Sequence, residues 1–292
     1  MNYDPILDFW NNRAALKAQA GSSDIIAKGL EIEALARYLS DGLTLAEFGC
    51  GNGITAVELA RRFGVLIHAF DFSAEMIKKA RQYAEEAGVA DRGRFEVADI
   101  RTPPVVEARF DVVYTERMLI NLPDWETQAR AIRALVGYLR PSGRLLLCEN
   151  SRVGLDILNS LRRAAGLDSI SPPWHNVYLD DAAMAALEVP GCHLERVEAY
   201  SATYYFLSRV VNAWLAHREG RQPAYDAPVN QLALLLPAFG DCAQGKLWVQ
   251  AWKEAGDAAT GKTYFWNGET GSVAWEMPAC FAPEKISAGP RA

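Results

Sequence analysis

The sequence predicts an α/β fold whose core is a doubly wound, mostly parallel β-sheet. Between residues 44 and 150, short apolar runs alternate with helical stretches, the connections are short, and a glycine-rich loop follows the first run. Such alternation is typical of βαβ units, in which helices cover both faces of the sheet. The 292 residues suffice for one large domain, with a surplus of about 40 residues at the C-terminus.

The elements follow one another in a regular order. Residues 1–40 are predicted to be helical and to form a lid, because apolar residues recur there at roughly helical spacing. Apolar runs predict strands at 44–48, 65–70, 94–97, 110–114 and 144–149, with two later strands at 193–200 and 246–251. Helices are expected at 54–63, 74–87 and 125–139, and a Pro-Ser-Gly turn at 141–143 precedes the fifth strand.

Two less regular regions, 151–185 and 201–245, are predicted to be insertions. They contain helical stretches at 153–165 and 204–218. Because ligands of open α/β sheets bind beyond the carboxyl ends of the strands, we expect both insertions to lie on the substrate side. A large domain is therefore expected to span residues 1–251.

Composition excludes several classes of protein. The hydrophobic fraction is 50% and the charged fraction 23%, so the chain is neither disordered nor fibrous. The net charge of −6 argues against a nucleic-acid-binding surface, which needs clustered basic side chains. The N-terminus does not resemble a signal peptide, and no apolar run reaches the length of about 18 residues that would cross a membrane.

The five cysteines are scattered through the chain and form no CxxC pair. A zinc site or a redox pair is therefore not expected, and we predict no metal. An odd number of cysteines without a disulfide framework indicates reduced thiols and a cytoplasmic location.

The glycine loop that follows the first strand carries the main functional signal. It contains Gly49, Gly51 and Gly53, with Glu47 just before it. A dinucleotide-binding loop would place its third glycine where Ile54 stands, and a carboxylate beside the loop would repel a pyrophosphate. The same carboxylate suits a ligand that carries an ammonium and a sulfonium. The string EFGCGNG resembles the first motif of the class I methyltransferases that use S-adenosylmethionine (SAM).

Three further strings resemble this family at the expected strand ends. They are HAFDFSAEMI, VADI, and FDVVY followed by LVGYLRPSGRLLL, in which Ser142 replaces a glycine of the family. The resemblance implies a Rossmann-like sheet of seven strands and SAM as the cofactor. It implies that Asp71 binds the ribose hydroxyls, although Asp71 could instead only cap the next helix. The cofactor-binding residues expected from the loop, the strand ends and the lid are Trp10, Arg13, Glu47, Gly49, Cys50, Gly51, Asn52, Asp71, Phe72, Met76, Asp99, Ile100 and Glu116.

Polar residues around the carboxyl ends of strands four and five are candidates for binding the substrate. They are Arg117, Asn121, Asn150 and Asn176. The strings ERMLINLPDWETQ and WHNVYL around them resemble a subgroup of bacterial small-molecule methyltransferases.

Transfer to an alcohol would require a proton acceptor. His175 is the first candidate by its intrinsic pKa and Glu149 is the second, while Tyr178 could orient the acceptor.

The C-terminal surplus, residues 252–281, resembles a WW domain, a small three-stranded module that binds proline-rich peptides. Two tryptophans, Trp252 and Trp275, enclose the block GKTYFWN, and a proline follows the second. Side chains alternate along a strand, so Tyr264 and Trp266 would share one face and form, with Trp275, an aromatic surface. That surface could meet a proline-rich peptide or dock on the chain's own large domain. Residues 282–292 are expected to be a flexible tail.

The sequence therefore predicts a SAM-dependent methyltransferase that modifies an oxygen or nitrogen atom of a small metabolite or saccharide. Nucleic acid and membrane are not expected as partners. Two alternative functions are compatible with the same fold. One is an enzyme that transfers or cyclises the aminobutyl arm of SAM and releases methylthioadenosine, and the other is an adaptor acting through the WW-like module. A nicotinamide oxidoreductase is disfavoured by the loop spacing and by Glu47.

Overall fold

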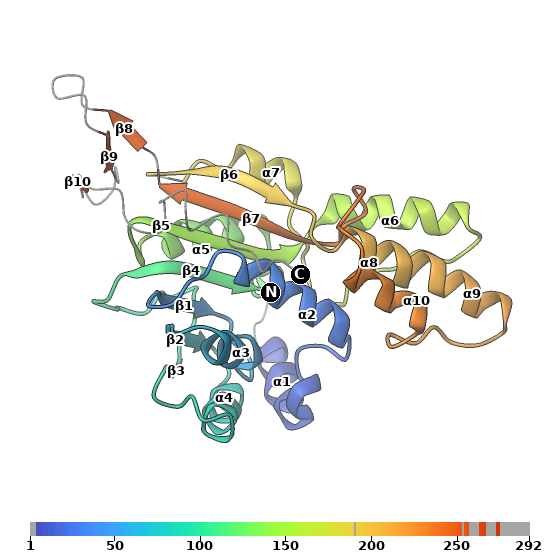
Figure 1. Ribbon diagram of the computed structural model, residues 1–292, viewed down its shortest axis with the longest axis horizontal. Coiled ribbons are helices and arrows are strands. Elements are labelled where there is room, and N and C mark those ends of the chain that lie inside the picture. Colours follow the sequence, from blue (N-terminus) through green and yellow to red (C-terminus); the bar gives the residue numbers. More distant parts are fainter. Residues whose placement is uncertain (1–3, 190, 253, 257–262, 267–272, 275–292) are drawn as a thin grey trace.

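The computed structural model describes residues 4–189, 191–252, 254–256, 263–266 and 273–274. Its main sheet has seven strands in the order β3-β2-β1-β4-β5-β7-β6 (Figure 1). Neighbouring strands from β3 to β5 are parallel, whereas β7 runs antiparallel to both β5 and β6. The predicted mostly parallel sheet is confirmed. Its strands are β1 (Thr44–Phe48), β2 (Leu66–Asp71), β3 (Gly93–Val97), β4 (Phe110–Glu116), β5 (Leu139–Asn150), β6 (Cys192–Glu198) and β7 (Gly245–Trp252).

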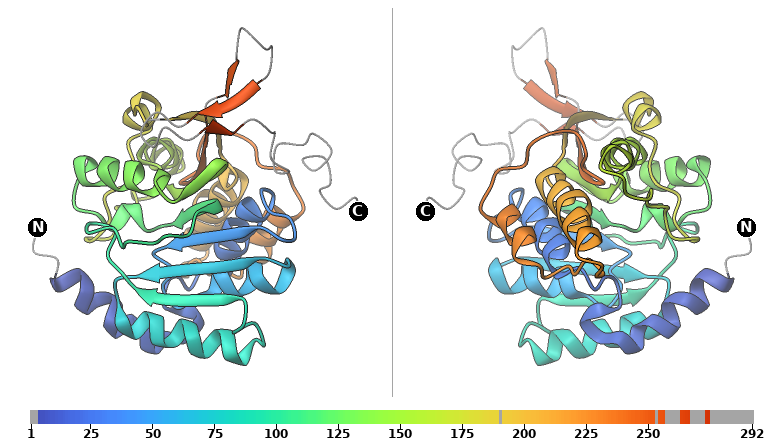
Figure 2. Two further views of the ribbon diagram at one scale, coloured as in Figure 1. Left: turned by 90° about the vertical axis from the view of Figure 1, so that its left-hand side faces the viewer. Right: turned by 90° about the vertical axis from the view of Figure 1, so that its right-hand side faces the viewer.

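Ten α-helices and four 3₁₀- or π-helical segments surround the sheet in the described part of the chain (Figure 2). The α-helices are α1 (Asp4–Arg13), α2 (Ile25–Ala36), α3 (Ile54–Arg62), α4 (Ala74–Glu86), α5 (Trp125–Val136), α6 (Arg152–Ala164), α7 (Asp181–Ala186), α8 (Ala202–Phe206), α9 (Asn212–Arg218) and α10 (Pro228–Gln231). The shorter segments are η1 (Ala14–Gln19), η2 (Leu119–Asn121), η3 (Leu207–Val211) and η4 (Leu232–Leu234). No helix among the described residues is long and apolar enough to cross a membrane.

Both faces of the central strands are buried, and the residues of these strands divide between the two faces by alternation. Leu45, Val112 and Leu146 pack into one core with α2, α3 and α4. Their chain neighbours Ala46, Val113 and Leu147 pack into a second core with α5 and α7. Since successive side chains of a strand point to opposite faces, strands covered on both sides are apolar at almost every position.

Side-chain caps fix where several helices begin. The Ser73 hydroxyl accepts a hydrogen bond from the amide of Met76 at 3.1 Å and starts α4. Asp124 accepts from the amide of Thr127 at 2.8 Å and starts α5. These caps satisfy amides that lack a partner in the first helical turn. They fix the first turns of the two helices that come after the carboxyl ends of β2 and β4.

The structure differs from the sequence prediction at several elements, and three of them show why. Strand β5 begins at Leu139 rather than after the predicted turn, and Ser142 adopts a φ of 67° inside it. The predicted helix over 204–218 is divided, because a π-helical segment, η3, separates α8 from α9. Helix α7 was not predicted, since its six residues are too few to show a helical period.

The C-terminal region contains three short antiparallel strands. They are β8 (Glu254–Gly256), β9 (Thr263–Trp266) and β10 (Val273–Ala274), in the order β10-β9-β8. Trp252 ends β7 and is buried in the core of the main sheet, with 2% of its surface exposed. The predicted aromatic surface lies outside the described residues, since these include neither Trp275 nor the side chains of Tyr264 and Trp266. The predicted tail, residues 282–292, also lies outside them.

Candidate functional site

A cavity of about 550 Å³ opens where β1, β2, β4 and β5 end. The ends of these strands contribute Phe48, Asp71, Glu116 and Asn150 to its wall. Helix α1, the start of α2, the loop over residues 173–178 and the insertion over residues 201–245 close it from the other sides. The cavity therefore lies at the edge where open α/β sheets bind ligands.

The glycine loop turns tightly against the end of β2. The amides of Gly49 and Cys50 both donate to the carbonyl of Phe70, at 2.7 and 2.9 Å. Gly49 has a φ of 80°, and a Cβ built on it would lie 2.3 Å from Cγ of Met118. Gly51 has a φ of 52°, but a Cβ there would meet nothing within 4 Å. Gly49 is thus required by close packing, whereas Gly51 leaves open space.

Two carboxylates stand at the ends of β2 and β3. Asp71 accepts hydrogen bonds from the amides of Gly51 and Ser73, at 2.8 and 2.9 Å, and lines the cavity. Burial raises the pKa of Asp71 to about 6, although the amides of Ser73 and Gly51 act in the opposite direction. Asp99 is hydrogen-bonded to Arg101 and lines the cavity together with the apolar Ile100 and Met76.

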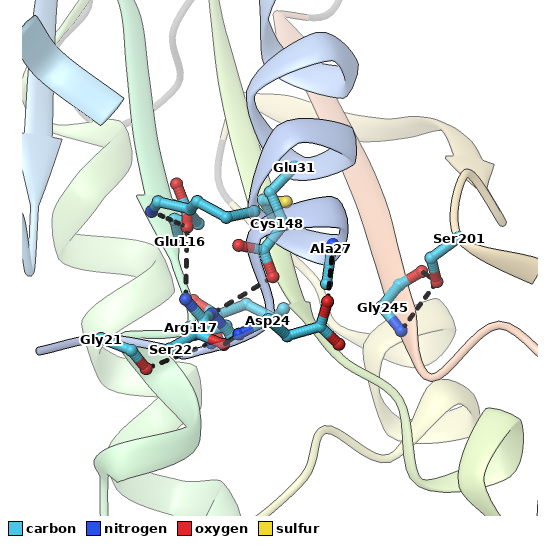
Figure 3. A network of polar contacts seen from close by, with 12 residues as sticks. Gly21, Ser22, Asp24, Ala27, Glu31, Glu116, Arg117, Cys148, Ser201 and Gly245 are labelled. Carbon is cyan, nitrogen blue, oxygen red and sulfur yellow. Dashed lines mark hydrogen bonds and ion pairs between the residues drawn. The ribbon is translucent and has the colours of Figure 1, made fainter. Parts of the chain in front are cut away.

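A buried network of charges crosses the cavity floor between α2 and the end of β4 (Figure 3). Glu116 is hydrogen-bonded to Lys28 and accepts from the hydroxyl of Thr55 at 2.5 Å. Nε of Arg117 lies 3.2 Å from Oε1 of Glu31. Burial raises the pKa of Glu31 to about 8, against the charge of Arg117. In Glu116 burial is outweighed by Lys28, Glu31 and Arg117, and its pKa falls to about 2.

Glu47 lies beside this network, below the glycine loop. Its carboxylate accepts a hydrogen bond from the hydroxyl of Tyr114 at 3.0 Å, and burial raises its pKa to about 8. The residue is 2% exposed and lines the cavity, so it faces the ligand space as predicted.

Tyrosines and an arginine line the part of the cavity formed by the insertion. The guanidinium of Arg209 is ion-paired with Asp24 at 2.6 Å and lies 5.1 and 4.7 Å from the ring centroids of Tyr205 and Tyr225. The Tyr178 hydroxyl accepts a hydrogen bond from Gln244 at 2.8 Å. We call Tyr178, Tyr205, Arg209 and Tyr225 the tyrosine end of the cavity.

His175 lies in an aromatic wall of the cavity. Its ring centroid is 4.4 Å from that of Phe9, 5.2 Å from that of Trp174 and 5.7 Å from that of Trp10. Burial, followed by the charge of Arg13, lowers the pKa of His175, so the neutral form dominates at pH 7. Among the described residues, its buried Nδ1 atom has no hydrogen-bond partner. His175, which lines the cavity, therefore contributes a ring nitrogen without a partner among the described residues.

Glu149 does not line the cavity, contrary to its expected role as a proton acceptor. Its carboxylate accepts hydrogen bonds from the Thr115 hydroxyl at 2.7 Å and from the amides of Met118 and Leu119 at 3.1 and 3.0 Å. The side chain is turned into the sheet edge and holds the loop after β4. Its role in the structure is to support that loop.

The remaining predicted residues of the large domain come together in the one cavity. The lining includes Trp10, Arg13, Glu47, Gly49, Cys50, Gly51, Asn52, Asp71, Phe72, Met76, Asp99, Ile100, Glu116, Arg117, Asn121, Asn150, His175, Asn176 and Tyr178. Burial raises the pKa of the Cys50 thiol well above its usual range, which agrees with a packing role.

Several cavity residues were missed by sequence reasoning. They include Asp24, Lys28, Glu31, Tyr205, Arg209, Tyr225 and Gln244. A signal existed for Glu31, because it stands between Ala27 and Leu35 in one stripe of a helix at spacings of four residues. A carboxylate in an otherwise apolar stripe indicates a buried polar role.

Comparison with known proteins agrees with this geometry. Residues 45–143 match the methyltransferase domain family. The 27-O-demethylrifamycin SV methyltransferase of Amycolatopsis mediterranei is 33% identical over 142 residues, which are 48% of this chain and 48% of that protein. A ubiquinone biosynthesis O-methyltransferase of Xylella fastidiosa is 30% identical over 162 residues, which are 53% of this chain and 63% of that protein. The chain thus spans about half the length of the first of these relatives and less than two thirds of the second.

Solved structures share the fold. The magnesium protoporphyrin IX methyltransferase of Synechocystis superposes with a TM-score of 0.55 at 16% identity, over 86% of this chain and 100% of that one. The cyclase SpnF superposes with a TM-score of 0.50 at 22% identity, over 77% of this chain and 80% of that one. At these identities the likeness concerns the fold alone. The residues that match the methyltransferase domain family, 45–143, include the glycine loop and nearly all of strands β1 to β4.

Proposed function

We propose that this chain is a SAM-dependent methyltransferase that modifies an oxygen or nitrogen atom of a small molecule. One observation carries the proposal. Within a segment that matches the methyltransferase domain family, the glycine loop, Asp71 and Asp99 line the same cavity. The small-molecule acceptor is supported by the names of the relatives, which refer to rifamycin and ubiquinone.

The residues present fit SAM by their chemistry. Asp71 and Asp99 offer acceptors for the hydroxyls and the amine of an adenosine, and the apolar Ile100 and Met76 suit its purine ring. Burial raises the pKa of Glu47 to about 8, and the positive charges of a bound ammonium and sulfonium would favour its ionised form. Open space beside Gly51 leaves room for the ligand to approach the backbone.

SAM, when bound, would supply an electrophilic methyl group with the sulfur as its leaving group, and the acceptor atom would give up a proton. In this step the chain itself positions the acceptor and takes up the proton. Neutral His175 is the proposed proton acceptor, because its Nδ1 is buried in the cavity wall. Tyr178, held by Gln244, is proposed to orient the acceptor.

Product analysis tests this proposal. The protein is incubated with SAM and a panel of small hydroxylated and amino compounds, and the products are identified by mass spectrometry. A compound that gains one methyl group, with an equal amount of S-adenosylhomocysteine, is the expected result. Methylthioadenosine as the product would instead assign the aminobutyl chemistry. An acceptor that rearranges while SAM is unchanged would assign a cyclase reaction, for which SpnF provides a structural precedent.

We further propose that residues 252–281 include a WW-like module that binds proline-rich peptides or docks on the large domain. The antiparallel order of β8, β9 and β10 supports a three-stranded unit. The burial of Trp252 in the main sheet favours a unit attached directly to the large domain. Titration of the whole chain with proline-rich peptides should change the tryptophan fluorescence of a peptide binder. An unchanged spectrum would favour docking.

A further inference from the structure

One end of the cavity carries a buried polar group that the proposed mechanism does not use. Glu31 lines the cavity with 5% of its side chain exposed. Its Oε1 faces Nε of Arg117 at 3.2 Å, and its neutral carboxyl shares a hydrogen bond with Glu116, whereas no donor among the described residues reaches its buried Oε2. A buried polar atom without a partner is destabilising, so such atoms in a cavity wall indicate a ligand group that satisfies them.

The surroundings hold Glu31 in place. Arg117 is itself fixed, since its amide donates to the carbonyl of Cys148 at 2.9 Å and its guanidinium lies 3.7 Å from Glu116. Glu116 in turn is paired with Lys28, and Figure 3 shows Glu31, Glu116 and Arg117 side by side. The carboxyl of Glu31 is thereby oriented before any ligand binds, which lowers the entropic cost of recognition.

Glu31 belongs to the tyrosine end rather than to the adenosine end. Its charge influences Cys148 in β5 and Tyr205 in α8. Asp71 and Asp99 follow β2 and β3, on the other side of β1 in the order of the sheet. The cofactor's adenosine and Glu31 would therefore lie at opposite ends of the cavity.

The tyrosine end offers aromatic surfaces in the same cavity, and its Tyr205 is close enough to Glu31 to be influenced by the charge of that carboxyl. Tyr178, Tyr205 and Tyr225 all line the cavity, and the guanidinium of Arg209 lies against the last two. The charge of Arg209 is already paired with Asp24, so the end does not present a free cation for an anionic substrate. Aromatic rings favour a flat apolar ligand, which they contact by stacking or edge-to-face packing.

We propose that the methyl acceptor is a hydroxylated aromatic ring that packs among the tyrosines and donates a hydrogen bond from a hydroxyl to Oε2 of Glu31. This inference rests on the proposed function and names its substrate class. Because burial raises the pKa of Glu31, the carboxyl is largely neutral at pH 7 and receives a neutral hydroxyl without adding net charge to the cavity.

The test uses the whole chain saturated with S-adenosylhomocysteine and catechol as the minimal hydroxylated ring. Cyclohexane-1,2-diol is the non-aromatic control, and both affinities are measured by ligand-observed NMR. We expect catechol to bind more tightly than the control. Glu31→Leu should weaken catechol about tenfold, the effect of one lost hydrogen bond, and leave S-adenosylhomocysteine unchanged. Glu33→Gln is the matched variant on the same helix, where Glu33 is exposed and paired with Arg62, and should change neither affinity.

A second variant keeps the test decisive if Glu31→Leu fails to fold. Tyr225 is 44% exposed at the rim, so Tyr225→Leu is expected to fold. It should weaken catechol about threefold and leave the control diol unchanged.

Three results would overturn the inference. The first is that catechol binds no more tightly than the control diol. The second is an unchanged catechol affinity in folded Glu31→Leu or Tyr225→Leu. The third is that Glu31→Leu loses affinity for S-adenosylhomocysteine, which would assign Glu31 to the cofactor's ammonium. If the wild-type chain does not bind S-adenosylhomocysteine at all, the proposed function fails as well.

Discussion

Replacing Gly49 by alanine, compared with the same change at Gly51, separates close packing of the glycine loop from its role in leaving space for the ligand. The backbone there is left-handed, with a φ of 80°, which costs a residue with a Cβ about 1–2 kcal/mol. The added Cβ would also lie 2.3 Å from Cγ and 2.4 Å from Cβ of Met118, and overpacking of this kind costs about 1–3 kcal/mol. The two terms add to about 2–5 kcal/mol of lost folding free energy.

Gly51→Ala is the matched control. Its φ of 52° is also left-handed, but the added Cβ meets nothing within 4 Å. Only the backbone term of about 1–2 kcal/mol should remain. The added methyl should instead enter the cavity and weaken the binding of S-adenosylhomocysteine, since Gly51 lines it.

Thermal unfolding and calorimetric titration measure the two effects. In a chain of this size about 1 kcal/mol corresponds to roughly 2–4 °C, so Gly49→Ala should lower the midpoint by about 10 °C and Gly51→Ala by less than about half of that. Equal midpoints for the two variants, or a lower one for Gly51→Ala, would show that Met118 does not restrict the loop.

Three other predictions concern the carboxylates and the histidine. Asp71→Asn should weaken S-adenosylhomocysteine about tenfold in calorimetry, because its oxygens hold Gly51 and face the ligand. Turnover should fall as the pH drops below the usual imidazole range and through the lowered pKa of His175. The free energy of unfolding should fall over the same range, because the unfolded chain binds the proton more readily than the folded chain. His175→Gln should remove both pH dependences. Glu149→Gln should lower the unfolding free energy by about 2 kcal/mol through lost hydrogen bonds and leave the pH profile of turnover unchanged; a shifted profile would restore Glu149 as a proton acceptor.

The fold was largely predictable because both cores impose local patterns. Strand β1 has the predicted bounds, since its apolar run ends at a glycine loop that cannot continue it. Strand β5 was predicted too short, because Pro141 and Ser142 favour a turn in isolation. Pairing of Leu139 with Phe110 extends the strand past them, and this is a tertiary effect.

The cofactor end of the site was more predictable than the tyrosine end. The glycine loop and Asp71 meet because parallel strands end at one edge, which follows from topology alone. Glu31 and Arg209 reach the cavity from α2 and η3, whose packing depends on distant contacts such as the pairing of Arg209 with Asp24. Glu149 was predicted to face the cavity and does not. The alternation of side chains along a strand predicts the face on which a residue lies, but not the direction in which a long side chain turns at the end of the strand.

Calorimetric titration of the whole chain with S-adenosylhomocysteine tests the central claim, that this cavity binds SAM. We predict saturable binding of one molecule per chain, weakened by Asp71→Asn, with no comparable binding of NADH. Absence of saturable binding, or tighter binding of NADH, would contradict the account and return the glycine loop to the dinucleotide-binding class.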